Sequence, residues 1–215
     1  MKQYKYIFFD LDGTLTNPEM GITNCVAFAL EKFGIHVENK KTLRKFIGPP
    51  LIPAFQQFYG LTKEESTQAL IFYRERFSTL GLFENEIYPN IEDVLKTIKY
   101  KNKKIILATS KPEVYAQKIL EHFGLHSYFD YIVGATMDES RSEKDAVIAY
   151  ALKCANITDK SSVIMIGDTK FDGIGAAKNN IDFLGVLYGF GSKIDLELAG
   201  AKYFAEDVLD ILTYI

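Results

Sequence analysis

Cysteine is scarce in this sequence, and long apolar segments are absent. Cys25 and Cys154 are the only cysteines among 215 residues. They lie far apart, each within a helical pattern, so we expect two reduced, buried thiols and no disulfide framework. No apolar run approaches the ~20 residues that a membrane-spanning helix needs, and the first five residues lead directly into a strand pattern, unlike a signal peptide. These observations predict a cytoplasmic protein without a membrane partner.

An excess of charge of one sign is absent as well. The 25 Lys and Arg residues and the 28 Asp and Glu residues leave a formal net charge of −3. A chain this close to neutrality gives no electrostatic reason to expect a nucleic-acid polymer or an anionic membrane as partner. No internal repeat occurs, and no protein partner is evident. With 47% apolar residues, the composition is that of an ordinary globular protein of one domain, or of one domain with an insert.

The sequence is organised around an apolar run that ends in two carboxylates. Residues 4–9 are rich in Ile, Tyr and Phe and predict a buried strand, which places Asp10 at its carboxyl end. Because side chains alternate along a strand, Asp10 and Asp12 can point to the same side. Two close carboxylates repel each other unless a proton or a cation intervenes. Taken alone, the pair is equally well explained as a strand followed by an Asp-Gly turn at Gly13.

A helical pattern without any convincing strand follows. Ile22, Val26, Ala29 and Phe33 fall on one face of a helix that Gly34 ends. Further helices are expected over residues 40–46, 52–59 and 70–80, and the two prolines after Gly48 separate the first of these from the second. This pattern predicts an all-helical domain at residues 17–83, inserted into a core domain made of residues 1–16 and 84–215.

From Pro89 onward, strands and helices alternate. Strand patterns cover residues 104–108, 131–134, 162–166 and 183–187, helical patterns lie between them, and a last helix is expected from Glu206. Such alternation predicts an α/β fold in which a parallel sheet has helices on both faces. Right-handed crossovers then bring the carboxyl ends of all strands to one edge. The helical insert leaves the first strand at that edge, so we expect it to overhang the edge.

Polar side chains follow the other strands at the same predicted edge. Thr109 and Ser110 come directly after the second strand, and Lys144 lies beyond the third. Asp168 and Asp172 follow the fourth. Individually, each is explained as a helix cap, a solvated lysine or a surface carboxylate. Together they suit phosphoryl chemistry, because oxygen-only acidic ligands favour Mg²⁺, a lysine and a hydroxyl can bind phosphoryl oxygens, and an aspartate can attack phosphorus and carry an acyl phosphate.

Four segments resemble the sequence motifs of the haloacid dehalogenase superfamily. They are Asp10-Leu11-Asp12-Gly13-Thr14, Thr109, Lys144, and Gly167-Asp168-Thr169-Lys170-Phe171-Asp172. The whole chain is similar to phosphoglycolate phosphatase-like hydrolases with a helical cap, whose bacterial members are often phosphoglycolate phosphatases or 5′-nucleotidases. Further segments that resemble this group are Gly48-Pro49-Pro50, Thr109-Ser110-Lys111-Pro112 and Tyr188-Gly189-Phe190-Gly191. The third motif departs from the lysine-proline form common in phosphoglycolate phosphatases, because Arg141-Ser142-Glu143-Lys144 replaces it.

The resemblance implies a Rossmann-like core with a helical cap, a Mg²⁺ cofactor and hydrolysis of small-molecule phosphate monoesters through an aspartyl phosphate. The implied catalytic residues are Asp10 as nucleophile, Asp12 as general acid and base, Thr109 and Lys144. The implied metal ligands are Asp10, the backbone carbonyl of Asp12, Asp168, and Asp172 directly or through water. The implied substrate-binding residues of the core are Gly13, Thr14, Ser110 and Lys111. Phosphoglycolate is the first expected substrate type, and nucleoside 5′-monophosphates are the alternative.

Two cations of the helical insert are further candidates for substrate binding. Arg44 and Lys45 lie on the short helix just before Gly48. A solvated helix face explains either residue as well. Because Lys144 already suits the transferred phosphoryl group, a cation of the insert would bind another polar group of the substrate, and arginine is suited to this by its fork of donors.

Four other functions fit parts of the pattern. A dehalogenase would share the nucleophile, but it needs no acid two residues further on, so Asp12 argues against it. A β-phosphoglucomutase-like phosphotransferase would keep both acids and would depend on a bisphosphate activator. A response-regulator receiver domain also gathers acids, a threonine and a lysine around Mg²⁺, but it is nearer ~120 residues and has no helical insert. A non-catalytic binding protein of this fold would usually lack one of the four motifs.

Overall fold

The computed structural model describes residues 3–215, which form two compact units. The α/β unit contains the residues up to Asn17 together with Ile87–Ile215, and the helical unit contains Pro18–Glu86. Almost all of the predicted insert, residues 17–83, lies within the helical unit. That this unit acts as a cap stays a prediction.

A six-stranded parallel sheet forms the centre of the α/β unit, in the order β5-β4-β1-β6-β7-β8. Its strands are β1 (Tyr6–Phe9), β4 (Lys104–Pro112), β5 (Tyr131–Ala135), β6 (Val163–Gly167), β7 (Asp182–Val186) and β8 (Tyr203–Ala205). Successive strands extend the sheet from β1 first toward β5 and then, from β6 on, in the opposite direction. The order therefore reverses between β1 and β6, and open α/β sheets bind ligands beyond the carboxyl ends of the strands at such a point. The predicted α/β fold is confirmed.

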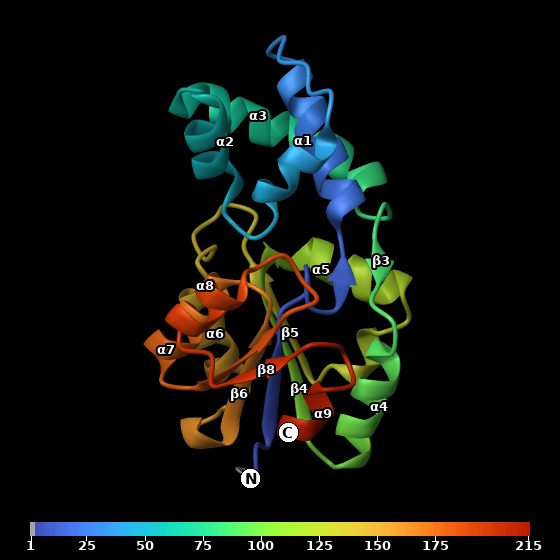
Figure 1. Ribbon diagram of the computed structural model, residues 1–215, viewed down its shortest axis with the longest axis vertical. Coiled ribbons are helices and arrows are strands. Elements are labelled where there is room, and N and C mark those ends of the chain that lie inside the picture. Colours follow the sequence, from blue (N-terminus) through green and yellow to red (C-terminus); the bar gives the residue numbers. More distant parts are fainter. Residues whose placement is uncertain (1–2) are drawn as a thin grey trace. The chain divides into compact units, whose positions relative to one another are not determined.

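Helices cover both faces of this sheet, as Figure 1 shows for the α/β unit. On one face lie α4 (Ile91–Tyr100) and α5 (Glu113–His122), and α9 (Ile211–Tyr214) packs against α4. On the other face, α6 (Lys144–Cys154) packs against α7 (Lys170–Asn179), which contacts α8 (Lys193–Leu198). The change of face follows from right-handed crossovers, because the two halves of the sheet grow in opposite directions. Two short 3₁₀ turns complete the unit, η3 (His126–Tyr128) and η4 (Lys160–Ser162).

The helical unit has its own apolar core. Its elements are α1 (Glu19–Glu31), η1 (Lys40–Phe46), α2 (Leu51–Tyr59), α3 (Lys63–Arg76) and the single π-helical turn η2 (Phe77–Gly81). The ring of Phe46 lies 5.0 Å from that of Phe55 and 5.4 Å from that of Phe58, so aromatic packing joins η1 to α2. A Cβ atom on Gly21 would lie 2.2 Å from the carbonyl oxygen of Gly81, so α1 and η2 approach closely only because Gly21 has no side chain.

The structure corrects several predicted boundaries. The second strand of the core does not end at Ala108 but continues to Pro112, which pairs with Ala135 of β5 after an irregularity in the register. A small second sheet, β2 (Thr16–Asn17) with β3 (Glu86–Ile87), was not predicted, and neither were β8 and α8. These elements are too short for a periodic pattern to indicate them.

The last helix and one thiol also differ from expectation. The C-terminal helix begins only at Ile211, because Asp207 and Asp210 accept backbone hydrogen bonds and fold the preceding residues into turns. Cys25 and Cys154 form no disulfide; Cys25 is buried as predicted, whereas Cys154 at the end of α6 is only partly buried. In the described part of the chain, no helix combines the length and apolarity required to cross a bilayer.

Candidate active site

Three aspartates meet at the carboxyl edge of the sheet, where the strand order reverses. Asp10 follows β1, Asp168 follows β6, and Asp172 lies in the first turn of α7. One carboxylate oxygen of each lies within 4.8 Å of those of the other two, and all three residues are buried. The N–H of Asp10 donates to the carbonyl oxygen of Ile166 at 2.9 Å, so the parallel pairing of β1 with β6 sets Asp10 and Asp168 at the same level.

Lys144, the first residue of α6, reaches the same cluster. Its Nζ lies 2.7 Å from Oδ1 of Asp10 and 2.8 Å from Oδ1 of Asp172, and it donates to the carbonyl oxygen of Ala108 at 3.3 Å. Burial by itself would lower the pKa of Lys144, but the carboxylates of Asp10 and Asp172 raise it above its ordinary value. Lys144 is therefore a fixed positive charge between two of the three aspartates.

The cluster contains three carboxyl groups but one ammonium group. Burial raises the pKa of Asp168 well above its usual range, and the nearby Asp172 and Asp10 raise it further. Burial is also the main cause of the raised pKa of Asp172. Oδ1 of Asp168 is buried and has no hydrogen-bond partner, and an unpaired buried charge costs several kcal/mol. Three carboxyl groups that face one ammonium group can therefore bind a second cation.

A divalent cation with oxygen ligands fits these residues. The metal-competent group found among residues 3–215 consists of three carboxylates, with no histidine or cysteine in it. Carboxylate oxygens are the ligands that Mg²⁺ prefers, whereas zinc sites in proteins use mainly nitrogen and sulfur. The unpartnered Oδ1 of Asp168 is the atom of the cluster most clearly in need of such an ion.

Asp12 contacts a different lysine. Nζ of Lys111 lies 2.5 Å from Oδ2 of Asp12, and the Lys111 side chain is only 5% exposed. Burial raises the pKa of Asp12, and the charge of Lys111 lowers it. The structure pairs Lys111 with this carboxylate, and its predicted contact with substrate stays a prediction. The sequence did not indicate this pair, because the extension of β4 to Pro112 is what brings Lys111 to the edge.

Gly13, Thr14, Thr109 and Ser110 are the remaining predicted site residues of the core. Gly13 has a left-handed backbone with φ 82°, and a Cβ atom there would lie 2.0 Å from Oδ2 of Asp168, so glycine is required for both reasons. Thr14 is fully buried and its hydroxyl has no hydrogen-bond partner. Thr109 is buried, and its hydroxyl accepts the N–H of Lys111 at 3.2 Å. Ser110 is half-buried, and its role stays a prediction.

A further strand end, after β7, also contributes to the edge. The N–H of Phe190 donates to Oδ2 of Asp168 at 2.8 Å, and the hydroxyl of Tyr188 donates to the carbonyl oxygen of Thr14 at 2.9 Å. Sequence reasoning assigned no site residue to this segment. The available signal was the repeated glycine in Tyr188-Gly189-Phe190-Gly191, which indicates close backbone approach.

Arg44 and Lys45 both have partners inside the helical unit. The guanidinium of Arg44 donates to the two carboxylate oxygens of Glu19 at 2.6 and 2.7 Å. The ammonium of Lys45 lies 4.6 Å from the ring centroid of Phe58, within range of a cation–π interaction. The Arg44 side chain remains about half exposed, at 52%. Their predicted contact with substrate stays a prediction.

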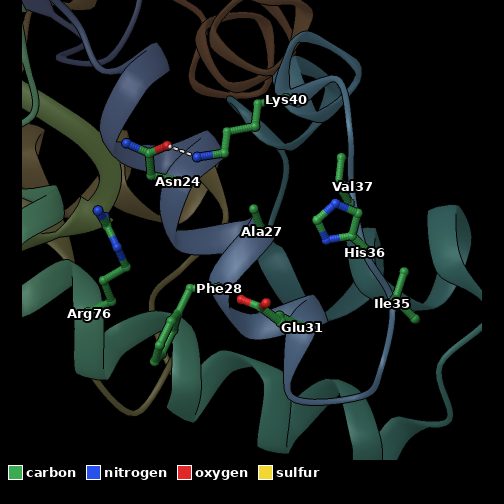
Figure 2. Close-up of a pocket in the computed structure, with 9 residues that line it drawn as sticks. All are labelled: Asn24, Ala27, Phe28, Glu31, Ile35, His36, Val37, Lys40 and Arg76. Atoms are coloured by element: carbon green, nitrogen blue, oxygen red, sulfur yellow. Dashed lines mark hydrogen bonds between the residues drawn. The ribbon is translucent and has the colours of Figure 1, made fainter.

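The helical unit also contains a pocket of about 310 Å³ between α1 and the segment that follows it (Figure 2). It is lined by Asn24, Ala27, Phe28, Glu31, Ile35, His36, Val37, Lys40 and Arg76. Lys40 donates to Asn24 at 2.8 Å, and Arg76 donates to both carboxylate oxygens of Glu84 at 2.7 Å. None of the predicted site residues lines this pocket, and its two long cationic side chains already have partners, so we do not assign the active site to it.

Comparison with known proteins agrees with this geometry. The family model described as "Haloacid dehalogenase-like hydrolase" matches residues 7–186. A 5′-nucleotidase of Pseudomonas aeruginosa is 38% identical over 206 residues, which cover 96% of this chain and 93% of that protein. The tyrosine-protein kinase PtkA of Mycobacterium tuberculosis is 34% identical over 86% of this chain, but the match spans only 62% of PtkA. A phosphoglycolate phosphatase of Psychrobacter arcticus is 26% identical over 97% of this chain and 94% of that protein.

A solved structure has the same fold as this chain. The crystal structure of a predicted phosphatase from Clostridium acetobutylicum superposes with a TM-score of 0.95 at 45% identity, covering 99% of this chain and 98% of that one. The family match extends over most of the chain and includes all of the clustered aspartates and Lys144. The chain therefore belongs to the haloacid dehalogenase-like hydrolases and is a phosphatase of that family.

Proposed function

We propose that this phosphatase hydrolyses small-molecule phosphate monoesters with Mg²⁺, through an aspartyl phosphate on Asp10. The observation that carries the proposal is the buried cluster of Asp10, Asp168 and Asp172 around Lys144, which has one ammonium group for three carboxylates. A phosphoryl group brings further negative charge, so it can enter such a site only together with a cation. We also propose a cytoplasmic location, with which two cysteines that form no disulfide are compatible.

The chemistry proceeds in two steps on this chain's own residues. A carboxylate oxygen of Asp10 attacks phosphorus, the ester P–O bond breaks, and Asp12 gives its proton to the leaving alcohol. Asp12, now ionised, takes a proton from a water molecule whose oxygen attacks phosphorus. The bond between Asp10 and phosphorus then breaks, which releases phosphate and restores both carboxyl groups. Lys144, and in our proposal Thr109, bind the phosphoryl oxygens, on which negative charge accumulates.

The residues that would hold Mg²⁺ are Asp10, Asp168 and Asp172, with the backbone carbonyl of Asp12 as a further ligand. When bound, the ion supplies Lewis-acid stabilisation of the phosphoryl oxygens. Asp172 accepts the N–H and the hydroxyl of Thr169 through Oδ2, at 3.0 and 2.9 Å. This holds its orientation, and its Oδ1 then lies against Lys144.

Two substrate types have support from relatives. The 5′-nucleotidase relative shares 38% identity over almost the whole chain, and the phosphoglycolate phosphatase relative shares 26%. The replacement of lysine-proline by Arg141-Ser142-Glu143-Lys144 also counts against phosphoglycolate. We therefore place nucleoside 5′-monophosphates first and phosphoglycolate second. A β-phosphoglucomutase-like transfer remains the least favoured alternative.

The test is a substrate screen of the purified full chain. Release of phosphate is measured with nucleoside monophosphates, phosphoglycolate and a phosphotyrosine peptide. With β-glucose 1-phosphate and a bisphosphate activator, formation of glucose 6-phosphate is measured instead. Each reaction is run with Mg²⁺, with Ca²⁺ and with excess chelator. We expect turnover only in the reactions that contain Mg²⁺, because Ca²⁺ does not keep the octahedral geometry that Mg²⁺ demands. Full activity in excess chelator would refute the metal-dependent mechanism.

The role of Asp12 predicts a dependence on the leaving group. Asp12→Asn removes the proton donor, so formation of the aspartyl phosphate from an alkyl ester should slow by ~10²–10⁴-fold. An aryl ester with a good leaving group needs little protonation, and its first step should be much less affected. Single-turnover phosphorylation rates with the two ester types provide the comparison. The same loss for both esters would contradict the acid role and point to disturbance of the Lys111 contact instead.

The predicted role of Arg44 is tested by substrate comparison. Arg44→Ala should raise KM or lower kcat for the natural substrate if Arg44 leaves Glu19 to bind a polar group of that substrate. A small aryl phosphate offers no such group and should be hydrolysed as by the wild type. The measurement is kcat/KM for both substrates, with Lys41→Ala on the same short helix as control. Unchanged kcat/KM for every substrate would leave Arg44 as a partner of Glu19 only.

A further inference from the structure

The loop after β7 closes on the carboxylate cluster and is held at both ends. The N–H of Leu187 donates to the carbonyl oxygen of Ala205 in β8 at 2.8 Å. The side chain of Ser192 caps α8 by accepting the N–H of Asp195. Between these two anchors lie Tyr188, Gly189, Phe190 and Gly191, which we call the 188–191 loop. It approaches Asp168 from a strand that contributes none of the four motifs.

We propose that the 188–191 loop is a positioning element for Asp168, which binds one carboxylate oxygen and leaves the other for the cation. The inference rests on the proposed function, because it assigns a residue of the magnesium site its orientation. The N–H of Phe190 holds Oδ2 at 2.8 Å, whereas Oδ1 is buried without a hydrogen-bond partner. Groups that bind a metal ligand from behind typically fix its orientation and its affinity for the metal.

The glycines of the loop allow its backbone to touch Asp168 directly. A Cβ atom on Gly189 would lie 2.3 Å from Cβ of Asp168 and 2.5 Å from the carbonyl oxygen of Gly13. A Cβ atom on Gly191 would lie 2.0 Å from the carbonyl oxygen of Asp168. Each of these distances is far below a van der Waals contact, so any side chain would displace either the loop or Asp168.

Tyr188 ties the same loop to the turn that follows Asp10. Its hydroxyl donates to the carbonyl oxygen of Thr14 at 2.9 Å, and its ring meets that of Tyr88 edge-on, with centroids 4.9 Å apart. The N–H of Tyr88 in turn donates to the carbonyl oxygen of Leu15 at 3.1 Å. The loop thus fixes Asp168 relative to the turn that carries Asp12 and Gly13. Because the hydrogen-bond donor to Asp168 is the backbone N–H of Phe190, a substitution of the Phe190 side chain keeps this donor.

The test measures magnesium binding separately from folding. Mg²⁺ alone is titrated into the full chain by calorimetry at constant pH, and thermal unfolding without Mg²⁺ reports stability. Gly189→Ala crowds Asp168 and should lower the affinity for Mg²⁺ by ~10–100-fold. Tyr188→Phe keeps the ring but loses the anchor on Thr14, and it should lower the affinity by about tenfold. Phe190→Ala keeps the backbone N–H and should bind Mg²⁺ as the wild type does.

Each outcome decides the inference. Wild-type affinity in a folded Gly189→Ala protein overturns it, and so does a lower Tm with unchanged affinity, which would mean that the loop only supports the fold. If Gly189→Ala does not fold, Tyr188→Phe decides in the same way, since it removes one oxygen atom only. A large loss of affinity in Phe190→Ala would assign the effect to the side chain and also overturn the inference. Absence of Mg²⁺ binding by the wild type would instead refute the proposed function itself, which the first titration shows before any variant is compared.

Discussion

Asparagine in place of Asp10 is expected to slow hydrolysis of every phosphate ester by ~10⁴-fold or more, because it removes the atom that attacks phosphorus. An amide oxygen is a poor nucleophile and cannot form the aspartyl phosphate. The fold should survive, since asparagine has almost the same shape and Lys144 keeps its contact with Asp172 at 2.8 Å. Steady-state hydrolysis of an aryl phosphate with Mg²⁺ gives the loss, and circular dichroism confirms the fold.

The matched control for this experiment is Asp93→Asn. Asp93 lies on α4, is exposed, and belongs to none of the groups at the carboxyl edge, so its replacement should leave turnover within twofold of the wild type. A folded Asp10→Asn protein that retains a tenth of wild-type turnover would exclude Asp10 as the nucleophile. The next candidates would then be the other carboxylates of the cluster.

Methionine in place of Lys144 is expected to give the largest loss of stability among the site variants. It removes the ammonium group that lies 2.7 Å from Asp10 and 2.8 Å from Asp172, while the length of the side chain is nearly kept. Breaking a buried ion pair from one side typically costs ~3–5 kcal/mol, because the remaining charges are left without compensation. The free energy of unfolding in urea, measured in chelator, should fall by about this amount. Turnover should fall as well, since the phosphoryl oxygens lose a cation.

The effect of Mg²⁺ on the stability of Lys144→Met distinguishes uncompensated charge from a simple packing defect. If the loss comes from uncompensated carboxylates, saturating Mg²⁺ should restore part of the stability of Lys144→Met, because the ion binds the same oxygens. Lys153→Met on the exposed side of α6 is the control and should change stability little. Equal free energies of unfolding for Lys144→Met and wild type in chelator would show that the carboxylates are neutral in the folded protein.

The sequence predicted the sheet and the meeting of the aspartates for identifiable physical reasons. Asp10 and Asp168 each end an apolar run, and parallel strands joined by right-handed crossovers bring such ends to one edge. Lys144 was predicted at the same edge, and in the structure it contacts both Asp10 and Asp172. By contrast, the pairing of Lys111 with Asp12 depends on an irregular extension of β4. Periodicity carries no information about such an irregularity.

The contribution of the 188–191 loop was missed for a different reason. Side chains that can react or bind are recognisable in a sequence, whereas Asp168 is held here by the N–H of Phe190 and by the absence of side chains on Gly189 and Gly13. Neither a glycine nor a backbone N–H can be recognised from the sequence as part of a binding site. Only the spatial neighbourhood of Asp168 shows why they are needed.

The position of β1 in the sheet has a consequence for biosynthesis. β1 leaves the ribosome before the other strands of this sheet, yet it stands between β4 and β6, with Tyr6 paired to Lys104 and to Val163. The helical unit, whose contacts are local, can fold as soon as it is complete, while the apolar β1 must wait for partners that are made much later. During that interval both edges of β1 are unpaired, so the nascent chain depends most on chaperones between the synthesis of the helical unit and the completion of β6.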